Sequence, residues 1–131
     1  MNLIEFLSAY SLSDGKIISF IIKYDNNCVD IFLQIKRSIL RNKYKPSKIK
    51  LIFEEVVRVD LVEDFSTGHD YSDCTLSQLE NGNFYLENGN FYLSLDPYDN
   101  SGIPNVDDNF KVISKNLMII DDETNESITI T

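Results

Sequence analysis

The sequence has no tryptophan, one histidine and two cysteines among its 131 residues, and it contains no long apolar run. A membrane-spanning helix needs about 20 consecutive apolar residues, so none is predicted. The N-terminus lacks the basic segment that opens a signal peptide, and we therefore expect a cytoplasmic protein. In that compartment the thiols of Cys28 and Cys74 are expected to stay reduced.

Several kinds of chemistry have no matching motif. The five glycines are scattered, so no glycine-rich phosphate loop exists, and no nucleophile elbow of the form G-x-S-x-G occurs. The acidic stretch DPYDNSGIPNVDDN lacks the residue order of a calcium-binding EF-hand loop. Asp107 and Asp108 are adjacent, and adjacent strand residues point to opposite faces, so they are poorly placed as an acid–base pair. We therefore predict no catalytic, cofactor-binding or metal-binding residues and no cofactor.

One enzyme-like alternative remains, centred on the single histidine. His69 lies in the segment STGHDYSD, close in sequence to Asp64, Asp70 and Asp73. Histidine and aspartate side chains can bind a divalent metal or transfer protons. The spacing matches no zinc motif, and zinc sites generally use two or more histidines or cysteines. The alternative is a small barrel that binds a ligand or catalyses a reaction at a site around His69.

The charges are divided unevenly along the chain. The net charge of −9 combines +3 over residues 1–62 with −12 over residues 63–131. Seven basic residues and no acidic one lie from Lys36 to Lys50, a pattern typical of a solvated hairpin and also of a phosphate-contacting patch. Because the overall charge would repel a polyanion, we expect no nucleic-acid partner. The acidic half would either receive a basic partner or keep the protein soluble.

Alternation of apolar and polar residues predicts the first strands. Residues 15–37 contain two alternating stretches on either side of Asp25-Asn26-Asn27, which is a typical turn sequence. Residues 48–64 also alternate, but one unbroken strand would place Glu55 on the apolar face. We therefore expect a turn or bulge at Glu54-Glu55.

The remaining segments complete a β-rich prediction. Residues 110–120 form the last clear strand, and the tail 126–131 is expected to add an edge strand or to fray. Pro46-Ser47 is expected to break the chain, residues 65–73 read as a loop, and residues 2–10 fit one or two helical turns. We predict a mainly β protein: a single-domain antiparallel sandwich or barrel built of hairpins, with at most a short N-terminal helix.

A seven-residue repeat interrupts this pattern, because ENGNFYL occupies residues 80–86 and again 87–93. Seven is odd, so inserting one copy into a strand would exchange the faces of everything beyond it. The pair Asn88-Gly89 favours a two-residue hairpin turn, in which Leu86 would face Phe91. The alternative is that one copy remains in the sheet and the other bulges out as a loop.

The arrangement of strands resembles small β-rich bacterial proteins of unknown function, some of which are grouped with immunity proteins of polymorphic toxin systems. The resemblance covers most of residues 15–120, and the one segment that resembles these proteins as a sequence motif is NFYLSLDPYD at residues 90–99. It implies a non-enzymatic, cytoplasmic binding protein. Those families have no assigned catalytic residues, so no residue roles are transferred.

These observations favour an interaction protein over an enzyme, with an immunity protein that binds and masks a basic toxin as its specific form. Tyrosine is common at interfaces because it combines apolar area with a polar tip. A homodimer through the edge of the predicted hairpin is a competing assembly, and no membrane partner is expected. The candidate interface consists of Tyr85, Glu87, Tyr92, Asp96, Tyr98 and Asp99.

Overall fold

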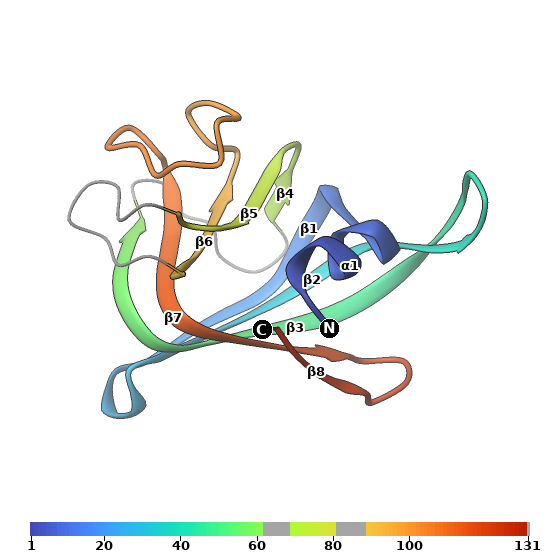
Figure 1. Cartoon of the computed structure of the whole chain (residues 1–131), viewed down its shortest axis with the longest axis horizontal. Helices are drawn as coiled ribbons and strands as arrows, with labels where there is room; N and C mark the ends of the chain where they lie inside the picture. The colour runs from blue at the N-terminus through green and yellow to red at the C-terminus, as the bar shows by residue number, and fades with distance from the viewer. Residues whose placement is uncertain (62–68, 81–88, 131) are drawn as a thin grey trace.

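The computed structural model describes residues 1–61, 69–80 and 89–130, and of His69 it describes the backbone. The chain forms one helix, one short 3-10 helix and eight strands within these ranges (Figure 1). In chain order they are α1 (Leu3–Ala9), β1 (Tyr10–Lys23), η1 (Tyr24–Asn26), β2 (Cys28–Leu40), β3 (Lys43–Leu61), β4 (His69–Tyr71), β5 (Cys74–Gln78), β6 (Phe91–Leu95), β7 (Phe110–Asp121) and β8 (Ser127–Thr129).

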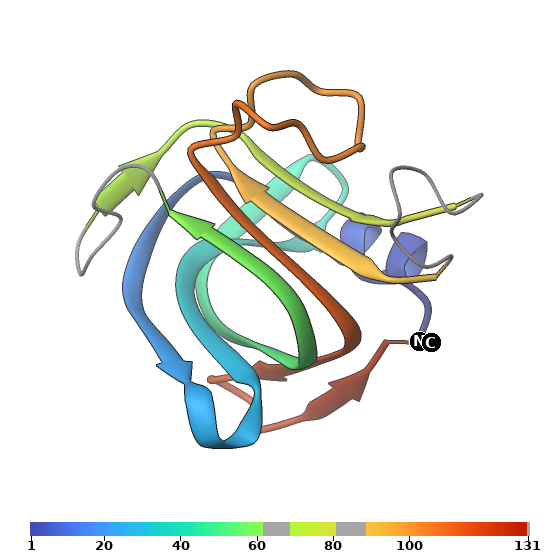
Figure 2. The ribbon, with the colours of Figure 1, turned by 90° about the vertical axis from the view of Figure 1, so that its left-hand side faces the viewer.

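The strands form one antiparallel sheet in the order β4-β1-β2-β3-β7-β6-β5, with β8 pairing with β7. The outermost strands β4 and β5 are separated in sequence by only Ser72 and Asp73. The chain therefore steps directly from one edge of the sheet to the other, and the sheet curls into a half-barrel (Figure 2). The prediction of a mainly β, antiparallel fold with one short N-terminal helix is confirmed.

The joint between the two edges is held by side chains as well as by backbone. The hydroxyl of Tyr71 donates to the carbonyl oxygen of Leu12 at 2.6 Å. A carboxylate oxygen of Asp96 accepts hydrogen bonds from the backbone N–H groups of Ser72 and Asp73, both at 2.9 Å. A Cβ on Gly15 would collide with the ring of Tyr71, so glycine is required for this close approach.

The alternation of the first strands places the core where the sequence predicts it. Ile17 pairs with Leu33 in β1 and β2, and Leu33 pairs with Ile49 in β3. These side chains point into the half-barrel with the buried faces of the other long strands, and α1 covers the interior with Leu3 and Phe6. The helix begins after Asn2, whose side chain accepts a hydrogen bond from the N–H of Glu5 at 2.8 Å.

The predicted irregularity in the middle of β3 is confirmed. Glu55 has a φ of 52°, in the left-handed region, and the pairing of β3 with β7 shifts between Val56 and Arg58. Pairing of β3 with β2 ends at Glu54. The bulge keeps the Glu55 carboxylate in solvent, and beyond it β3 continues to pair with β7.

The predicted chain break at Pro46-Ser47 and the predicted loop at residues 65–73 are wrong, and the C-terminal tail forms a strand. Pro46-Ser47 does not break the chain, because Pro46 lies in β3 before its pairing with β7 begins at Ile49, where no donor N–H is needed on that side. Within the predicted loop 65–73, residues 69–71 form β4 against β1. The tail pairs with β7 as the edge strand β8.

The predicted hairpin between the two copies of the repeat is wrong. Phe91 pairs with Gln78 of β5 on one side and with Ser114 of β7 on the other, so no edge is left for Leu86. The second copy thus enters the middle of the sheet as β6. Residues 81–88 lie outside the described ranges. The alternative of a looped-out copy concerns these residues and therefore stays a prediction. A dimer through the edge of that hairpin loses its basis, because β6 has a neighbour on both sides.

Candidate functional site

The loop between β6 and β7, residues 96–109, carries three of the predicted interface residues: Asp96, Tyr98 and Asp99. Its surface mixes acidic and apolar side chains. Tyr98 is 65% exposed and Val106 is 89% exposed, and the carboxylates of Asp99 and Asp107 lie in solvent beside them. We call residues 96–109 the acidic loop.

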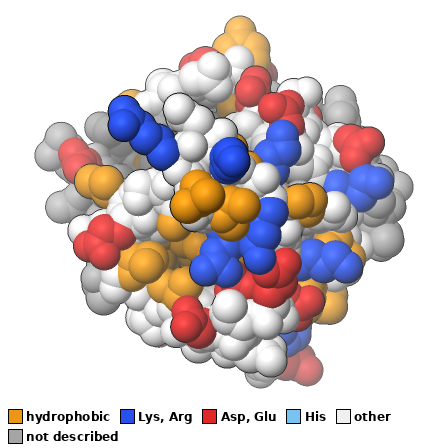
Figure 3. Space-filling view, turned by 90° about the vertical axis from the view of Figure 1, so that its right-hand side faces the viewer, with side chains coloured by type: hydrophobic (Ala, Val, Ile, Leu, Met, Phe, Trp, Pro, Cys, Tyr) orange, Lys and Arg blue, Asp and Glu red, His pale blue; other side chains and the backbone are white. Residues whose placement is uncertain are grey.

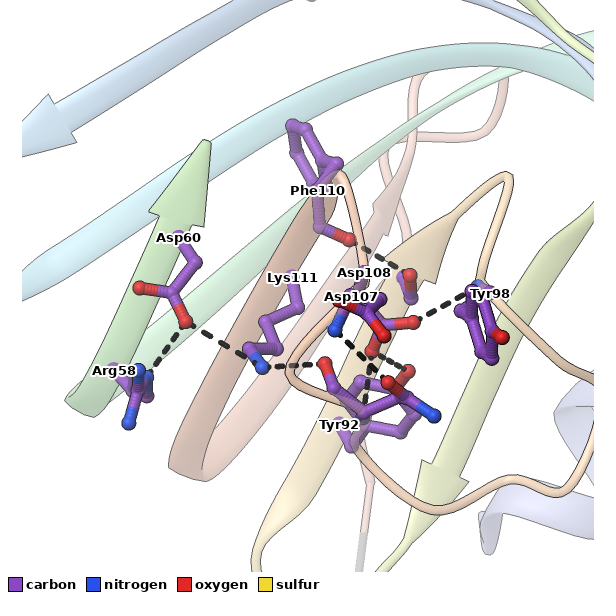
Figure 4. A network of polar contacts seen from close by, with 10 residues as sticks. Arg58, Asp60, Tyr92, Tyr98, Asp107, Asp108, Phe110 and Lys111 are labelled. Atoms are coloured by element: carbon purple, nitrogen blue, oxygen red, sulfur yellow. Dashed lines mark hydrogen bonds and ion pairs between the residues drawn. The ribbon is translucent and has the colours of Figure 1, made fainter. Parts of the chain in front are cut away.

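A buried carboxylate organises the acidic loop from below. Asp108 is 1% exposed, and it accepts three hydrogen bonds (Figure 4). The hydroxyl of Tyr92 donates to it at 2.5 Å, and the backbone N–H groups of Tyr98 and Asn105 each donate at 3.0 Å. Asp108 therefore connects both arms of the loop to the floor of the sheet.

A buried lysine connects the same loop to the neighbouring strand. The amine of Lys111 in β7 donates to the carbonyl oxygen of Asn105 at 2.7 Å and lies 3.5 Å from a carboxylate oxygen of Asp60. The guanidinium of Arg58 contacts the same oxygen at 2.6 Å. This chain of contacts runs from β3 through β7 to the loop, as Figure 4 shows.

The outer turn of the acidic loop has its own hydrogen bonds. The backbone N–H and the hydroxyl of Ser101 both donate to Asp99, at 3.0 and 2.6 Å. These bonds, led by that of the hydroxyl, lower the pKa of the Asp99 carboxyl from its ordinary value. Gly102 has a φ of 77°, and its carbonyl oxygen accepts a 2.7 Å hydrogen bond from Ser77 in β5. The loop is therefore ordered along its length.

The structure corrects the predicted role of Tyr92 and divides the other candidates. Tyr92 is 1% exposed and packs with Leu79 and Ile113, so it does not offer a surface contact. Burial, followed by the hydrogen bond to Asp108, raises the pKa of its hydroxyl. The prediction failed because the acidic loop covers the outer face of β6. Tyr85 and Glu87 lie outside the described residues.

Asp96, Tyr98 and Asp99 are brought together in one loop, but they do different things. Asp96 is half-buried with a φ of 49°, and its carboxylate closes the joint between β4 and β5. Tyr98 and Asp99 remain available at the surface. Sequence analysis missed Asp108, because it lies in a loop, where alternation does not indicate which of two adjacent carboxylates is buried.

The alternative site around His69 lies only partly within the described residues. A pocket of about 240 Å³ lies next to it, and its described lining residues are Asp14, Gly15, Lys16, Gln34, Ile35, Lys36, Pro46 and Asp70. The backbone of His69 pairs with Ile17, and the half-barrel interior is filled by the side chains of the core. Its neighbour Asp70 is exposed and lies 3.8 Å from Lys16. The described residues contain no cluster of three His, Cys, Asp or Glu side chains able to hold a metal.

A groove of about 300 Å³ lies elsewhere, at the turn between β1 and β2 and along the second half of β3. Its floor is mostly apolar, and Cys28 in its wall donates its thiol to Asp30 at 3.4 Å. Burial, and then this hydrogen bond, raises the pKa of the Cys28 thiol, which makes this thiol a weaker nucleophile at neutral pH. The described lining residues are Ile22, Lys23, Tyr24, Asn27, Cys28, Val29, Val56, Val59 and Leu61.

Comparison with protein-family models, with curated proteins and with solved structures finds no match to this chain. The resemblance to immunity proteins therefore depends on the strand pattern and the segment at residues 90–99 alone. Among the described residues, no helix has the length and apolar character that crossing a membrane requires.

Proposed function

We propose that this chain is a non-enzymatic binding protein that receives a basic partner protein on the acidic loop. The observation that carries the proposal is the arrangement beneath the loop, where buried Asp108 accepts hydrogen bonds from Tyr92, Tyr98 and Asn105. A loop ordered before binding loses little conformational entropy when a partner docks. Its exposed aromatic and aliphatic side chains can then contribute contact area at low cost.

The charges around these side chains support a basic partner. Asp99 and Asp107 lie in solvent near Tyr98 and Val106, and no basic residue occurs between Asp96 and Asn109. Complementary charge at the rim of an interface mainly accelerates association and selects the partner. The apolar centre slows dissociation once contact is made.

The specific form that we propose is an immunity protein that masks a basic toxin. It rests on the resemblance described above and on the fit between an ordered acidic surface and a cationic protein. Masking requires only tight binding, and the proposal therefore needs no catalytic residue in this chain. The partner would be the toxin-like C-terminal domain of a secreted protein encoded beside this chain.

Co-expression of that neighbouring domain tests the proposal directly. The domain alone should stop growth, and this chain should restore it. Association of the purified proteins should be fast at low salt and should slow at higher salt, because exposed charges are screened beyond about 8 Å at physiological ionic strength. The double variant Asp99→Asn/Asp107→Asn should associate more slowly with little change in dissociation. Unprotected growth, or association that is insensitive to both salt and variant, would refute a basic partner on this loop.

A further inference from the structure

A second exposed surface lies at the tip of the hairpin between β2 and β3, far from the acidic loop in sequence and opposite in charge. The hairpin turns at Arg41 and Asn42, and it projects from the right of Figure 1. Ile39 is 50% exposed and Leu40 is 63% exposed, and the ring of Tyr44 is exposed beside them. Figure 3 shows a group of hydrophobic side chains with Lys and Arg side chains around it on this face, and Asp and Glu side chains next to those basic groups.

The basic residues of the hairpin fall into two groups. At its base, Arg37 lies 3.5 Å from Asp121, and Lys45 lies 3.0 Å from Glu123, so these charges are balanced by the turn between β7 and β8. Nearer the tip, Arg41 and Lys43 are exposed and form no ion pair with any described residue. The tip thus combines two aliphatic side chains, one tyrosine and two free cations, with no acidic residue.

The tip is poorly suited to pairing with a second copy of this chain. Pro46 interrupts the donors on the outer edge of β3, and proline at a sheet edge opposes strand addition. A second hairpin would also bring Arg41 and Lys43 against the same charges, which repel when they lie opposite one another. The complementary surface must therefore be anionic, and it must accept a narrow, convex apolar projection.

We propose that the tip of the β2–β3 hairpin is an anchor for an anionic membrane surface. Ile39 and Leu40 would enter the boundary between headgroups and acyl chains, with Tyr44 at headgroup level. Arg41 and Lys43 would contact lipid phosphates and carboxylates. The tip presents aliphatic, aromatic and basic side chains together, and these are the three kinds of side chain that favour a bilayer interface. A flat protein surface would leave such a convex tip with little contact area.

The geometry separates this tip from the negative charge of the rest of the molecule. Leu40 pairs with Lys43 at the tip, and Arg37 pairs with Lys45 beside the acidic turn. Three residues of strand at roughly 3.3 Å each place the tip about 10 Å beyond that turn. This distance exceeds the screening length of about 8 Å at physiological ionic strength. Repulsion between the acidic turn and an anionic membrane is therefore screened, and attraction of the tip's own cations dominates.

The inference goes beyond the proposed function and does not depend on it. It also departs from the expectation of no membrane partner, which considered only spanning segments. Two aliphatic residues and two cations give weak, reversible binding, so the anchor would serve to concentrate the protein at a surface on which a second contact completes attachment.

Vesicle flotation tests the anchor with the complete protein. Probes are vesicles of phosphatidylcholine alone and vesicles with about 30% phosphatidylserine, whose charge attracts exposed Lys and Arg. The wild-type chain should float with the anionic vesicles and remain in solution with the neutral ones. The double variant Ile39→Ser/Leu40→Ser should bind at least about tenfold more weakly, since it removes the apolar contact.

Two further variants separate charge from general stickiness. Arg41→Gln/Lys43→Gln should weaken binding about fivefold for each charge removed, and about 1 M salt should have a similar effect because it shortens the screening length. The matched control is Ile21→Ser, which removes an exposed aliphatic side chain of β1 that pairs with Asp30 near the start of β2, at the end of that strand opposite the tip. It should bind like the wild type.

Three outcomes would overturn the proposal. One is no flotation of the wild-type chain with anionic vesicles, and another is equal binding by the tip variants and the wild type. The third is binding of poly-glutamate to the tip without binding of anionic vesicles, which would indicate an acidic protein as the partner of the tip. Circular dichroism of each variant shows that a loss of binding does not come from unfolding.

Discussion

The acidic loop and the tip of the β2–β3 hairpin both expose apolar side chains among charges, but the protein supports them in different ways. The loop is held from inside, where Asp108 and Lys111 bond to its backbone. Within the described part of the chain, the hairpin tip beyond the acidic turn between β7 and β8 is supported by the pairing of its own two strands.

This difference separates binding from stability. In the loop, the residues that shape the surface are also buried in the fold, so a substitution beneath it should cost both stability and binding. At the tip, the exposed residues contribute little to the core. Substitutions there should therefore change binding and leave the free energy of unfolding almost unchanged. Loops on a rigid support are common sites of specific recognition. A projecting hairpin without tertiary contacts suits weaker, less specific contacts.

The largest effect is expected for Asp108→Ala. It would leave the buried hydroxyl of Tyr92 and two partly buried backbone N–H groups without their acceptor, which should lower the free energy of unfolding by about 3 kcal/mol. Ile39→Ser/Leu40→Ser at the tip should change it by less than about 0.5 kcal/mol. Urea unfolding monitored by circular dichroism measures both. A similar cost for the two variants would abolish the distinction between the regions.

A smaller effect is expected for Tyr92→Phe, which removes one hydroxyl and leaves the ring in place. A hydrogen bond to a charged group contributes about 2 kcal/mol, and the free energy of unfolding should fall by that amount. Tyr98→Phe is the matched control, because its hydroxyl is exposed and only its backbone N–H contacts Asp108. Thermal unfolding of both variants is the measurement. An unchanged stability of Tyr92→Phe would show that the 2.5 Å contact carries little weight.

Removing one copy of the repeat should stabilise the protein slightly. Deleting residues 80–86 gives the same chain as deleting 87–93, and it leaves Glu87, Asn88 and Gly89 between Leu79 and Asn90. Leu79 already exchanges hydrogen bonds with Gly89 and Asn90, both at 2.7 Å. Gly89 has a φ of 91°, which suits a three-residue hairpin loop.

Shortening the connection from ten residues to three should raise the free energy of unfolding by about 1 kcal/mol through lower loop-closure entropy. Binding at both surfaces should stay as in the wild type, since the deletion touches neither region. Denaturant unfolding of the shortened chain measures the change. Loss of a cooperative transition would instead show that the full connection is integral to the core.

The smallest expected effect is on stability at low pH, and it depends on Asp121 at the base of the β2–β3 hairpin. Burial alone would raise the pKa of Asp121, but the hydrogen bond from Tyr10, the backbone N–H groups of Glu123 and Thr124, and the charge of Arg37 together lower it. A carboxyl with a lowered pKa in the folded state stabilises the protein at neutral pH and loses that contribution as pH falls below about 4. Tyr10→Phe should therefore reduce stability at pH 7 and show a weaker further loss on acidification. A parallel pH profile for both proteins would contradict this linkage.

Sequence patterns predicted the parts of the fold that depend on local chemistry. The alternation in β1 and β2 identified the core face, and the conflict at Glu55 located a bulge, because one misplaced carboxylate is costly enough to bend a strand. Pro46 was misread because its effect depends on whether a neighbouring strand needs its missing N–H. The short strand β4 carries too few residues for any periodic signal.

The candidate site was predicted only in part, for a related reason. Tyr98 and Asp99 stand in a polar, loop-like segment, and the structure exposes both, while their role at an interface stays a prediction. Tyr92 was placed on the surface because alternation separates two faces but does not reveal that a later segment will cover the second one. Asp108 could not be identified, since the burial of a carboxylate depends on donors from Tyr92 and Asn105 that meet only in the folded chain.

The most direct test of the central claim compares the two surfaces in one binding measurement. Isothermal titration of the neighbouring toxin-like domain would be carried out with Tyr98→Ala/Val106→Ser in the loop and with Ile39→Ser/Leu40→Ser in the hairpin tip. Each variant removes two exposed apolar side chains. If the acidic loop is the partner surface, the loop variant should lose at least about tenfold in affinity and the tip variant should bind like the wild type. The opposite order, or an equal loss in both, would contradict the assignment of the acidic loop.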